Sequence, residues 1–465
     1  MNTLPRYSIT DDGAIPDGKT INTAAIQQTL DRIRESGGGE VIVPPGVFLT
    51  GSLEIHSHTL LTLMPGAILR GSPNLEDYRI NGPVPQAERE PFRNPAMQDR
   101  HLLLLHRAKG VTIRGPGEID GNGEAFWNPP GSNPNGPMYQ HWWTHRNWQR
   151  PCPMMSYVWC EDLRLEGFTV RNSPGWTFEL LNCDRVVVHG VQVQNNFWGP
   201  NTDAFDICGC RDVMISDCHI VCGDDAFCVK TMPHTRSAER ITITNCTMRT
   251  NCVGLKLGCF ESHQDMRQIT FSNNVVYNSS RAVGIYNFKG ATFEDIIISN
   301  LVCDDDNELY LNRPIHIDLR HEVKRGWGGE SPTGKAGIVR RVQISNVVAR
   351  TRGRILLTTA DGGVMEDILL RDITMVYPEV EDPEEVFPMT RSAQFSNHSP
   401  EAQIARGALV TDGVDRLQVY NLNLRWPNEV KGPAFAAGWF RNTTSHVDAP
   451  LAKGQGDVED WIQVG

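Results

Sequence analysis

The chain has 465 residues and a formal net charge of −11, because 55 Asp and Glu outnumber 44 Lys and Arg. This length exceeds that of a typical compact single core, whereas a repeat solenoid escapes the limit because it grows along one axis. The negative charge argues against a nucleic-acid-binding surface and weakly against tight binding of polyanions, but a local basic subsite for an acidic sugar stays compatible with it.

The opening residues are polar and lack the apolar core of a secretory signal. No run of about 18 apolar residues is present that would span a membrane. We therefore expect a cytoplasmic location, with secretion as the alternative if a leader has been removed. The 12 cysteines are then expected to be reduced and buried, because many lie in or beside β-like runs and none has the spacing of a zinc site.

The first predicted element is a short helix that caps the N-terminal end of the fold. Its apolar positions from Ala25 to Ile33 recur at helical spacing, and Thr20, Asn22 or Thr23 is the expected N-cap. Three glycines at 37–39 end the helix. The stretch EVIVPPGVFL then predicts two strands around a Pro-Pro-Gly turn. A capping helix is expected here because the first coil of a β-stack would otherwise expose unpaired backbone.

A repeated pattern runs along the chain from residue 111. Each copy has an apolar alternation, then a polar residue or glycine at a bend, then a second apolar pair. Copies between Leu163 and Ile296 begin 23, 27, 28, 28 and 27 residues apart. This spacing is the signature of a parallel β-helix, and antiparallel strands would not keep it. The ten copies begin at Val111, Leu163, Val186, Val213, Ile241, Ile269, Ile296, Val342, Ile368 and Leu417.

We therefore predict an all-β protein, a parallel β-helix of about ten rungs that forms a single domain over residues 1–465. Residues 1–70 would form the cap and first strands, and residues 425–465 a C-terminal tail. The tryptophan-rich stretch 124–150 is predicted to be an inserted loop. Its rings, Trp127, Trp142, Trp143 and Trp148, either stack on sugar rings or pack the loop against the solenoid.

Two further polar stretches interrupt the repeat. Residues 308–333 are rich in Arg and His and are predicted to be an inserted loop that either lines a groove or is solvated. Residues 377–403 form a polar loop and a candidate lid.

The stretch from Gly199 to Thr231 carries acids at two points. Asp203 ends an Asn-Thr-Asp triplet, and the pair Asp224 and Asp225 begins 21 positions later. Because this separation is roughly one solenoid repeat, the two points are expected to stack. Glycoside hydrolysis needs such carboxylates, one to protonate a leaving oxygen and another to activate water or attack the sugar. The alternatives are an Asx-type turn residue for Asp203 and a solvated turn for the pair.

At these acidic clusters the chain resembles glycoside hydrolase family 28, the polygalacturonases and their relatives. The matching motifs are Asn201-Thr202-Asp203 and Gly223-Asp224-Asp225, and Lys230 stands where the family tends to carry a lysine. The segments GAIPDGKTINTAAIQ, GPGEIDGNGEAFW, RPCPMMSYVWC and NSPGWTF also look like that family, so the resemblance covers most of the chain.

The resemblance implies a right-handed parallel β-helix and single-displacement hydrolysis with inversion. Carried over by position, Asp224 would be the general acid, while Asp203 and Asp225 would hold the attacking water. This chemistry needs one protonated carboxylic acid beside ionised carboxylates, and like charges held close favour that division. Inversion rests on the resemblance alone, because inverting enzymes usually separate their carboxylates more widely than neighbouring rungs do. No metal and no cofactor is expected.

Two family motifs are altered. Val253 stands near the histidine of the usual Gly-His-Gly motif, and the Arg-Ile-Lys motif that grips a substrate carboxylate is replaced by a stretch that keeps Arg281, Tyr286 and Lys289. A rebuilt subsite of this kind should hold a carboxylate less well. The predicted substrates are thus short pectin-derived or related plant oligosaccharides, cleaved by exo-action, rather than long unbranched polygalacturonate.

The candidate substrate contacts are Asn201, Lys230, Lys256, Arg281, Tyr286 and Lys289. For the last three the alternative is a surface turn. Two other function classes stay open. A polysaccharide lyase or epimerase on the same fold would use Lys256 or Lys289 as the proton abstractor, often with a metal, and a non-catalytic solenoid would only bind glycans. No nucleic-acid or membrane partner is expected, and the sequence leaves the oligomeric state open.

Overall fold

The computed structural model describes residues 4–80, 99–131, 141–146, 149–305, 312–321, 336–379, 398–426, 430–448 and 456–464. The described chain is built mainly of strands, which pair almost entirely in parallel. It forms two compact units, an N-terminal unit of Met1–Phe227 with His234–Arg236, and a C-terminal unit of Cys228–Pro233 with Ser237–Gly465. Taken separately, each unit is a stack of parallel β-helical coils, which confirms the predicted fold class.

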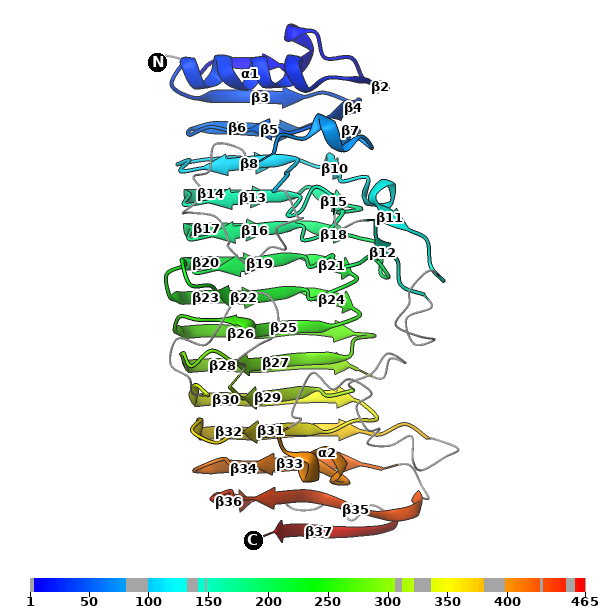
Figure 1. Cartoon of the computed structure of the whole chain (residues 1–465), viewed down its shortest axis with the longest axis vertical. Helices are drawn as coiled ribbons and strands as arrows, with labels where there is room; N and C mark the ends of the chain where they lie inside the picture. The colour runs from blue at the N-terminus through cyan, green and yellow to red at the C-terminus, as the bar shows by residue number, and fades with distance from the viewer. Residues whose placement is uncertain are drawn as a thin grey trace. The chain divides into compact units, whose positions relative to one another are not determined.

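Helix α1 (Thr23–Glu35) lies beside β3 at the start of the N-terminal unit (Figure 1). Its buried face is formed by Ile26, Leu30 and Ile33 together with Thr29, as the apolar spacing predicts. The N-cap is Asn22, but its side chain bonds the backbone of Ile15 instead of the first helical turn. The three glycines after the helix all have positive φ, a conformation that glycine adopts without steric cost.

In the N-terminal unit each coil carries up to three strands, and equivalent strands of successive coils pair in register. For example, Phe178 of β16 faces Phe205 of β19, and the two rings stack with centroids 4.6 Å apart. The strands are β1 (Arg6–Ser8), β2 (Asp17–Ile21), β3 (Gly39–Val43), β4 (Gly46–Thr50), β5 (Leu53–Glu54), β6 (Thr59–Leu63), β7 (Ala67–Gly71), β8 (Leu103–His106), β9 (Thr112–Arg114), β10 (Glu118–Asp120), β11 (Trp127–Asn128), β12 (Thr144–His145), β13 (Met155–Val158), β14 (Glu161–Glu166), β15 (Thr169–Arg171), β16 (Phe178–Leu181), β17 (Asp184–His189), β18 (Gln192–Gln194), β19 (Phe205–Cys208), β20 (Arg211–Ser216) and β21 (His219–Cys222). The 3-10 turns are η1 (Ile9–Asp12), η2 (Leu75–Asp77) and η4 (Gly123–Phe126).

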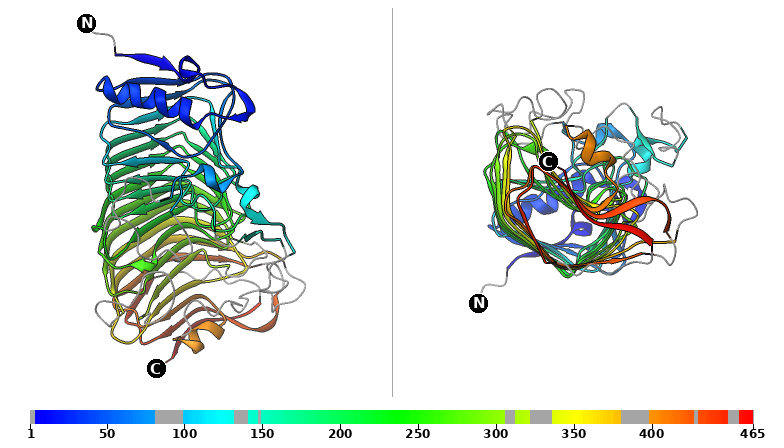
Figure 2. Two further views of the ribbon diagram at one scale, coloured as in Figure 1. Left: turned by 45° about the horizontal axis from the view of Figure 1, so that its top comes forward. Right: turned by 90° about the horizontal axis from the view of Figure 1, so that it is seen from below.

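The C-terminal unit repeats the same arrangement with longer strands (Figure 2). Strand β22 (Phe227–Thr231) contains the boundary between the units. The remaining strands are β23 (Ala238–Thr244), β24 (Thr247–Thr250), β25 (Val253–Ser262), β26 (Met266–Tyr277), β27 (Arg281–Asn287), β28 (Thr292–Asp304), β29 (Ile315–Leu319), β30 (Ile338–Arg350), β31 (Ile355–Thr359), β32 (Val364–Val376), β33 (Gly407–Asp412), β34 (Leu417–Arg425), β35 (Val430–Arg441), β36 (Ser445–Asp448) and β37 (Gly456–Val464). One short helix, α2 (Pro400–Ile404), precedes β33.

The bend in every copy of the repeat is made by a residue with a left-handed backbone. Glycine adopts this conformation freely, and Asn and Asp adopt it more readily than other residues do. In the C-terminal unit, the amide of Asn300 donates to Asn273, and that of Asn346 to Asn300, each over 2.8 Å. The bend residues are Gly115, Gly167, Gly190, Asp217, Asn245, Asn273, Asn300, Asn346, Asp372 and Asn421.

The structure corrects two predicted segments. The loop predicted over 308–333 contains β29, whose five residues are all buried, so this part is a strand of the stack. The tail predicted over 425–465 contains strands β35, β36 and β37. The structure has no disulfide bond among the twelve cysteines, all of which lie in its described part, and all but Cys252 are buried, as their places in or beside β-like runs predicted. Among the described residues, none of the helices has the length and apolar character needed to cross a membrane.

Candidate active site

The two acidic points lie in successive turns of the N-terminal unit, directly before β19 and β22. The Thr202 hydroxyl accepts a hydrogen bond from the Gly223 N–H at 2.9 Å and donates to the Gly199 carbonyl at 3.3 Å. A Cβ at Gly223 would lie only 2.3 Å from that same carbonyl oxygen. Glycine is therefore required at this position, because any side chain would force the two turns apart.

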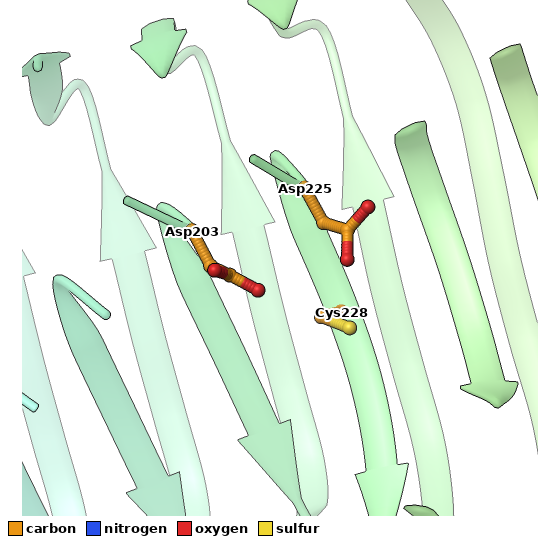
Figure 3. Close-up of side chains that lie close together, drawn as sticks. All are labelled: Asp203, Asp225 and Cys228. Carbon is orange, nitrogen blue, oxygen red and sulfur yellow. The ribbon is translucent and has the colours of Figure 1, made fainter. Parts of the chain in front are cut away.

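The backbone carbonyls of Asp203 and Asp225 take part in the parallel hydrogen bonding between successive coils. Thr177 N–H donates to the Asp203 carbonyl at 2.9 Å, and Ala204 N–H donates to the Asp225 carbonyl at 2.9 Å. Asp203 and Asp225 consequently stand on adjacent coils, and their side chains point the same way (Figure 3). The predicted stacking of the two acidic points is confirmed.

The three aspartates differ in their exposure to solvent. Asp203 and Asp225 are 2% and 1% exposed, whereas Asp224 is half-buried. Carboxylate oxygens of Asp203 and Asp225 lie within 4.8 Å of each other, and so do those of Asp224 and Asp225. These positions exclude the alternative of a solvated turn for Asp225.

Asn201 and the backbone hold Asp224 in place. The Asn201 amide donates to Asp224 Oδ2 at 3.2 Å, and the Asp225 N–H donates to Asp224 Oδ1 at 3.0 Å. Asn201 itself has a left-handed backbone with a φ of 51°. Of the predicted substrate contacts, Asn201 is thus also a residue that orients an acid.

This arrangement suits acid and base chemistry at one glycosidic bond. Carboxylates crowded together and withdrawn from water repel one another when ionised, which favours keeping a proton on one of them. The half-buried Asp224 is the carboxyl that an outside oxygen reaches most readily. Between the expected acid and one of its partners, oxygens of Asp224 and Asp225 lie within 4.8 Å of each other, closer than the roughly 6.5–9.5 Å common in inverting enzymes, so the spacing does not by itself indicate inversion.

The other predicted substrate contacts belong to the C-terminal unit. Lys230, Arg281, Tyr286 and Lys289 are at most 2% exposed, and Lys256 is half-buried. The alternative that Arg281, Tyr286 and Lys289 form a surface turn is therefore wrong. Whether these residues contact a substrate stays a prediction.

Arg281 and Tyr286 belong to a buried polar cluster. Arg281 Nη1 donates to the Tyr286 hydroxyl at 2.9 Å, and that hydroxyl lies 3.1 Å from His316 Nδ1. Burial raises the pKa of Tyr286 to about 12, although Arg281 opposes the shift. Burial, followed by the charges of Arg313 and Arg281, lowers the pKa of His316 well below its usual value, so its ring is neutral.

Gly284 explains how the altered Arg-Ile-Lys stretch is packed. A Cβ at Gly284 would lie 2.5 Å from the ring of Tyr286, so the ring lies over the glycine. In register, Gly284 stands between Lys256 of β25 and His316 of β29. The aromatic ring thus occupies space that a side chain at position 284 would need.

Sequence reasoning did not single out two buried acids near Asp203. Glu179 of β16 and Asp206 of β19 are register partners with exposures of 3% and 0%. The hydroxyl of Ser156 donates to Glu179 at 2.5 Å. The available signal was one acid inside each of two otherwise apolar strands, FELL and FDIC.

Comparison with known proteins identifies the family. The model described as "Glycosyl hydrolases family 28" matches residues 93–386, which is more than half of the chain. The chain belongs to this family. A probable polygalacturonase from Vitis vinifera is 28% identical over 229 residues, covering 48% of this chain and 44% of that protein. The chain spans only about half the length of the curated relatives it matches, with 44%, 60% and 59% covered in three of them.

Solved structures of two exopolygalacturonases share the fold. The exopolygalacturonase from Thermotoga maritima is 19% identical, with a TM-score of 0.64 over 80% of this chain and 87% of that one. The family 28 exopolygalacturonase from Yersinia enterocolitica is 17% identical, with a TM-score of 0.60 over 99% of this chain and 78% of that one. These similarities show the right-handed parallel β-helix.

Proposed function

We propose that this family 28 member is a glycoside hydrolase that cleaves galacturonate-containing, pectin-type oligosaccharides by single displacement. Asp224 donates a proton to the leaving oxygen, and Asp203 with Asp225 positions the attacking water and accepts its proton. The observation that carries the proposal is the stacking of these three carboxyls on two interlocked turns, with only Asp224 substantially open to solvent.

The preference for short substrates and for exo-action is part of the same proposal. The stretch that carries Arg-Ile-Lys in polygalacturonases here holds Gly284 beneath the ring of Tyr286, and Arg281 bonds that tyrosine. A guanidinium already engaged within the protein grips a substrate carboxylate less firmly than a fork aimed at the ligand. Two of the structures with the same fold are exopolygalacturonases, which supports exo-action.

The test compares galacturonate oligosaccharides, long unbranched polygalacturonate and other pectic saccharides as substrates, with product analysis by chromatography and of the anomeric configuration. We expect release of small products from chain ends, with faster turnover of short saccharides than of the polymer. Asp224→Asn should lower kcat by at least about 100-fold, the usual scale for loss of a general acid. Its thermal unfolding should change little, because the side chain is half-buried at the surface.

Near wild-type turnover by Asp224→Asn would contradict the assignment of the acid. Efficient random cleavage of the long polymer would contradict the substrate preference but not the catalytic assignment. Saccharide binding without turnover, unchanged in Asp224→Asn, would favour a glycan-binding protein.

A further inference from the structure

The tryptophan-rich insertion is anchored on the segment that leads into Asn201 and Asp203. Within a parallel fold it contributes an antiparallel hairpin, in which Trp127 of β11 pairs with His145 of β12 (Figure 1). Directly before β12, the Trp143 N–H donates to the Trp198 carbonyl at 3.0 Å. The insertion thus contacts the segment that leads to the acids.

Trp127 is the structural anchor of this contact. It is 1% exposed, and its indole N–H donates to the Pro174 carbonyl at 2.9 Å. A Cβ at Gly199 would lie 2.8 Å from its ring, so the ring packs closely against the start of the catalytic turn. For Trp127 the sugar-stacking prediction is therefore wrong, and the packing alternative holds. Trp148 lies outside the described residues.

Besides Trp143, which is half-buried with its ring centroid 6.0 Å from that of Trp127, three aromatic rings remain partly open to solvent. The Trp198 ring has its centroid 5.2 Å from that of Phe197 and 5.9 Å from that of Trp142, both in edge-to-face geometry. The exposed His141 ring lies 5.3 Å from it on a tilted plane. Phe197, Trp142 and Trp198 are each half-buried. A cluster of half-exposed aromatic rings beside a catalytic turn marks a ligand surface, because such apolar area is unfavourable in water.

The cluster also contains a buried polar atom, the indole nitrogen of Trp142. The indole nitrogen of Trp142 is buried and has no hydrogen-bond partner within the described part of the chain. Buried indole N–H groups normally find an acceptor. A sugar hydroxyl or ring oxygen bound against the rings would supply one.

We propose that Trp198, Trp142 and Phe197 form an aromatic subsite that holds a second pyranose ring of the saccharide being cleaved. The proposal rests on the proposed function for the identity of the saccharide. The C–H face of a pyranose is apolar and packs on an aromatic ring, while its hydroxyl groups accept from donors at the edge. Trp198 stands three residues before Asn201 on one continuous segment, so a chain that reaches the acids also passes the rings.

The subsite should make affinity depend on saccharide length. In an Asp224→Asn background, binding of α-1,4-linked galacturonate saccharides of increasing length, from the monomer upward, would be measured by titration calorimetry. We expect affinity to rise once the saccharide is long enough to occupy the aromatic subsite. Adding Trp198→Ala should weaken binding of these longer saccharides by roughly five- to ten-fold, the size of a lost aromatic contact, and leave the monomer unaffected.

Two further variants distinguish a loss of sugar binding from a folding defect caused by Trp198→Ala. Trp142→Phe keeps a ring but removes the indole N–H, and should weaken binding of the longer saccharides several-fold with an unchanged unfolding midpoint. Tyr420→Ala removes a half-buried aromatic ring on β34 and should leave all affinities unchanged. An identical length dependence with and without Trp198, or no binding at any length, would overturn the aromatic subsite. If wild type binds but does not cleave these saccharides, the proposed function fails, and the binding series still decides the subsite.

Discussion

Two uncharged hydrogen-bond donors help to hold Asp224 in position. The Asn201 amide and the Asp225 N–H fix its two oxygens, and the Thr202 hydroxyl ties the two turns together. A rigid frame of this kind is what acid catalysis requires, because the proton donor must stay within hydrogen-bond reach of the leaving oxygen. The residues beside the acids therefore contribute to catalysis through the position of Asp224.

Gly223→Ala tests this frame. The new Cβ would lie 2.3 Å from the Gly199 carbonyl, so the turn that carries Asp224 must move. We expect kcat to fall by at least about 10-fold, because small displacements of catalytic groups are costly. Gly407→Ala is the matched control, since its Cβ would meet its nearest neighbour at 3.3 Å. Equal activity of the two variants on a galacturonate oligosaccharide would show that the turn tolerates displacement.

Each coil has two corners at which a residue adopts a left-handed backbone conformation with positive φ. Only the first of these corners was recognisable from the sequence. The first corner is the bend of each repeat, where Gly, Asn or Asp is the residue type expected in this conformation. At the second, residues such as Arg185 and Arg341 adopt positive φ, which an arginine does not suggest. Arg185 bridges Glu161 and Asp162, and an acidic pair similarly faces Arg341. Such pairing joins residues 23 to 47 positions apart and becomes visible only once the coils are in register.

The first corner predicts a contrast between two substitutions of Asn300. Asn300 has a left-handed φ of 53°, which alanine disfavours, and its amide donates to Asn273 and accepts from Asn346. Asn300→Ala therefore forces alanine into this conformation and removes both side-chain hydrogen bonds, here called the amide ladder. We expect a loss of about 1–2 kcal/mol in the free energy of unfolding. Asn300→Gly loses the same ladder but not the conformational preference, so its loss should be smaller. Urea unfolding compares the two, and equal losses would mean that the ladder, not the backbone, dominates.

The second corner predicts a pH dependence of stability. Hydrogen bonds from Arg340 and Arg341 lower the pKa of Glu294 despite its burial, and those from Arg341 lower that of Asp295. A carboxyl whose folded pKa is depressed stabilises the fold above its unfolded pKa of about 4, and the contribution is lost as pH falls through the lower folded value. Arg341→Gln should therefore lower the unfolding midpoint slightly near pH 7 and flatten its decline in acid.

The change in unfolding midpoint caused by Arg341→Gln should depend on salt concentration. Arg341 and Asp295 are exposed and Glu294 is half-buried, so the difference in unfolding midpoint between wild type and Arg341→Gln should shrink as ionic strength rises. A difference that persists unchanged in acid and in high salt would point to packing by the arginine side chain.

The sequence was sufficient for the parts of the molecule that repeat. Copies spaced about one coil apart predicted the stack, and that spacing placed Asp203 beside the acidic pair. The sequence-based prediction was wrong where the repeat is interrupted. There β29 lies within a stretch whose polar composition is typical of a loop. The sequence also provided no means to see that Trp127 is buried while Trp142 and Trp198 are half-exposed. Those differences arise from the antiparallel hairpin, which has no counterpart in the repeat.

The closely spaced carboxylates of Asp203 and Asp225 are compatible with a second reaction, metal-dependent elimination, and one experiment distinguishes it from hydrolysis. Oxygens of Asp203 and Asp225 within 4.8 Å of each other are also a ligand set that a hard cation such as calcium accepts. A lyase on this fold would use such a cation and yield an unsaturated product, whereas the proposed hydrolysis assigns every carboxyl to proton transfer or to holding water. We expect full turnover of galacturonate oligosaccharides in excess chelator, with no absorbance from an unsaturated product. Activity that disappears with the chelator and returns with calcium would instead assign the acids to metal binding and the reaction to elimination.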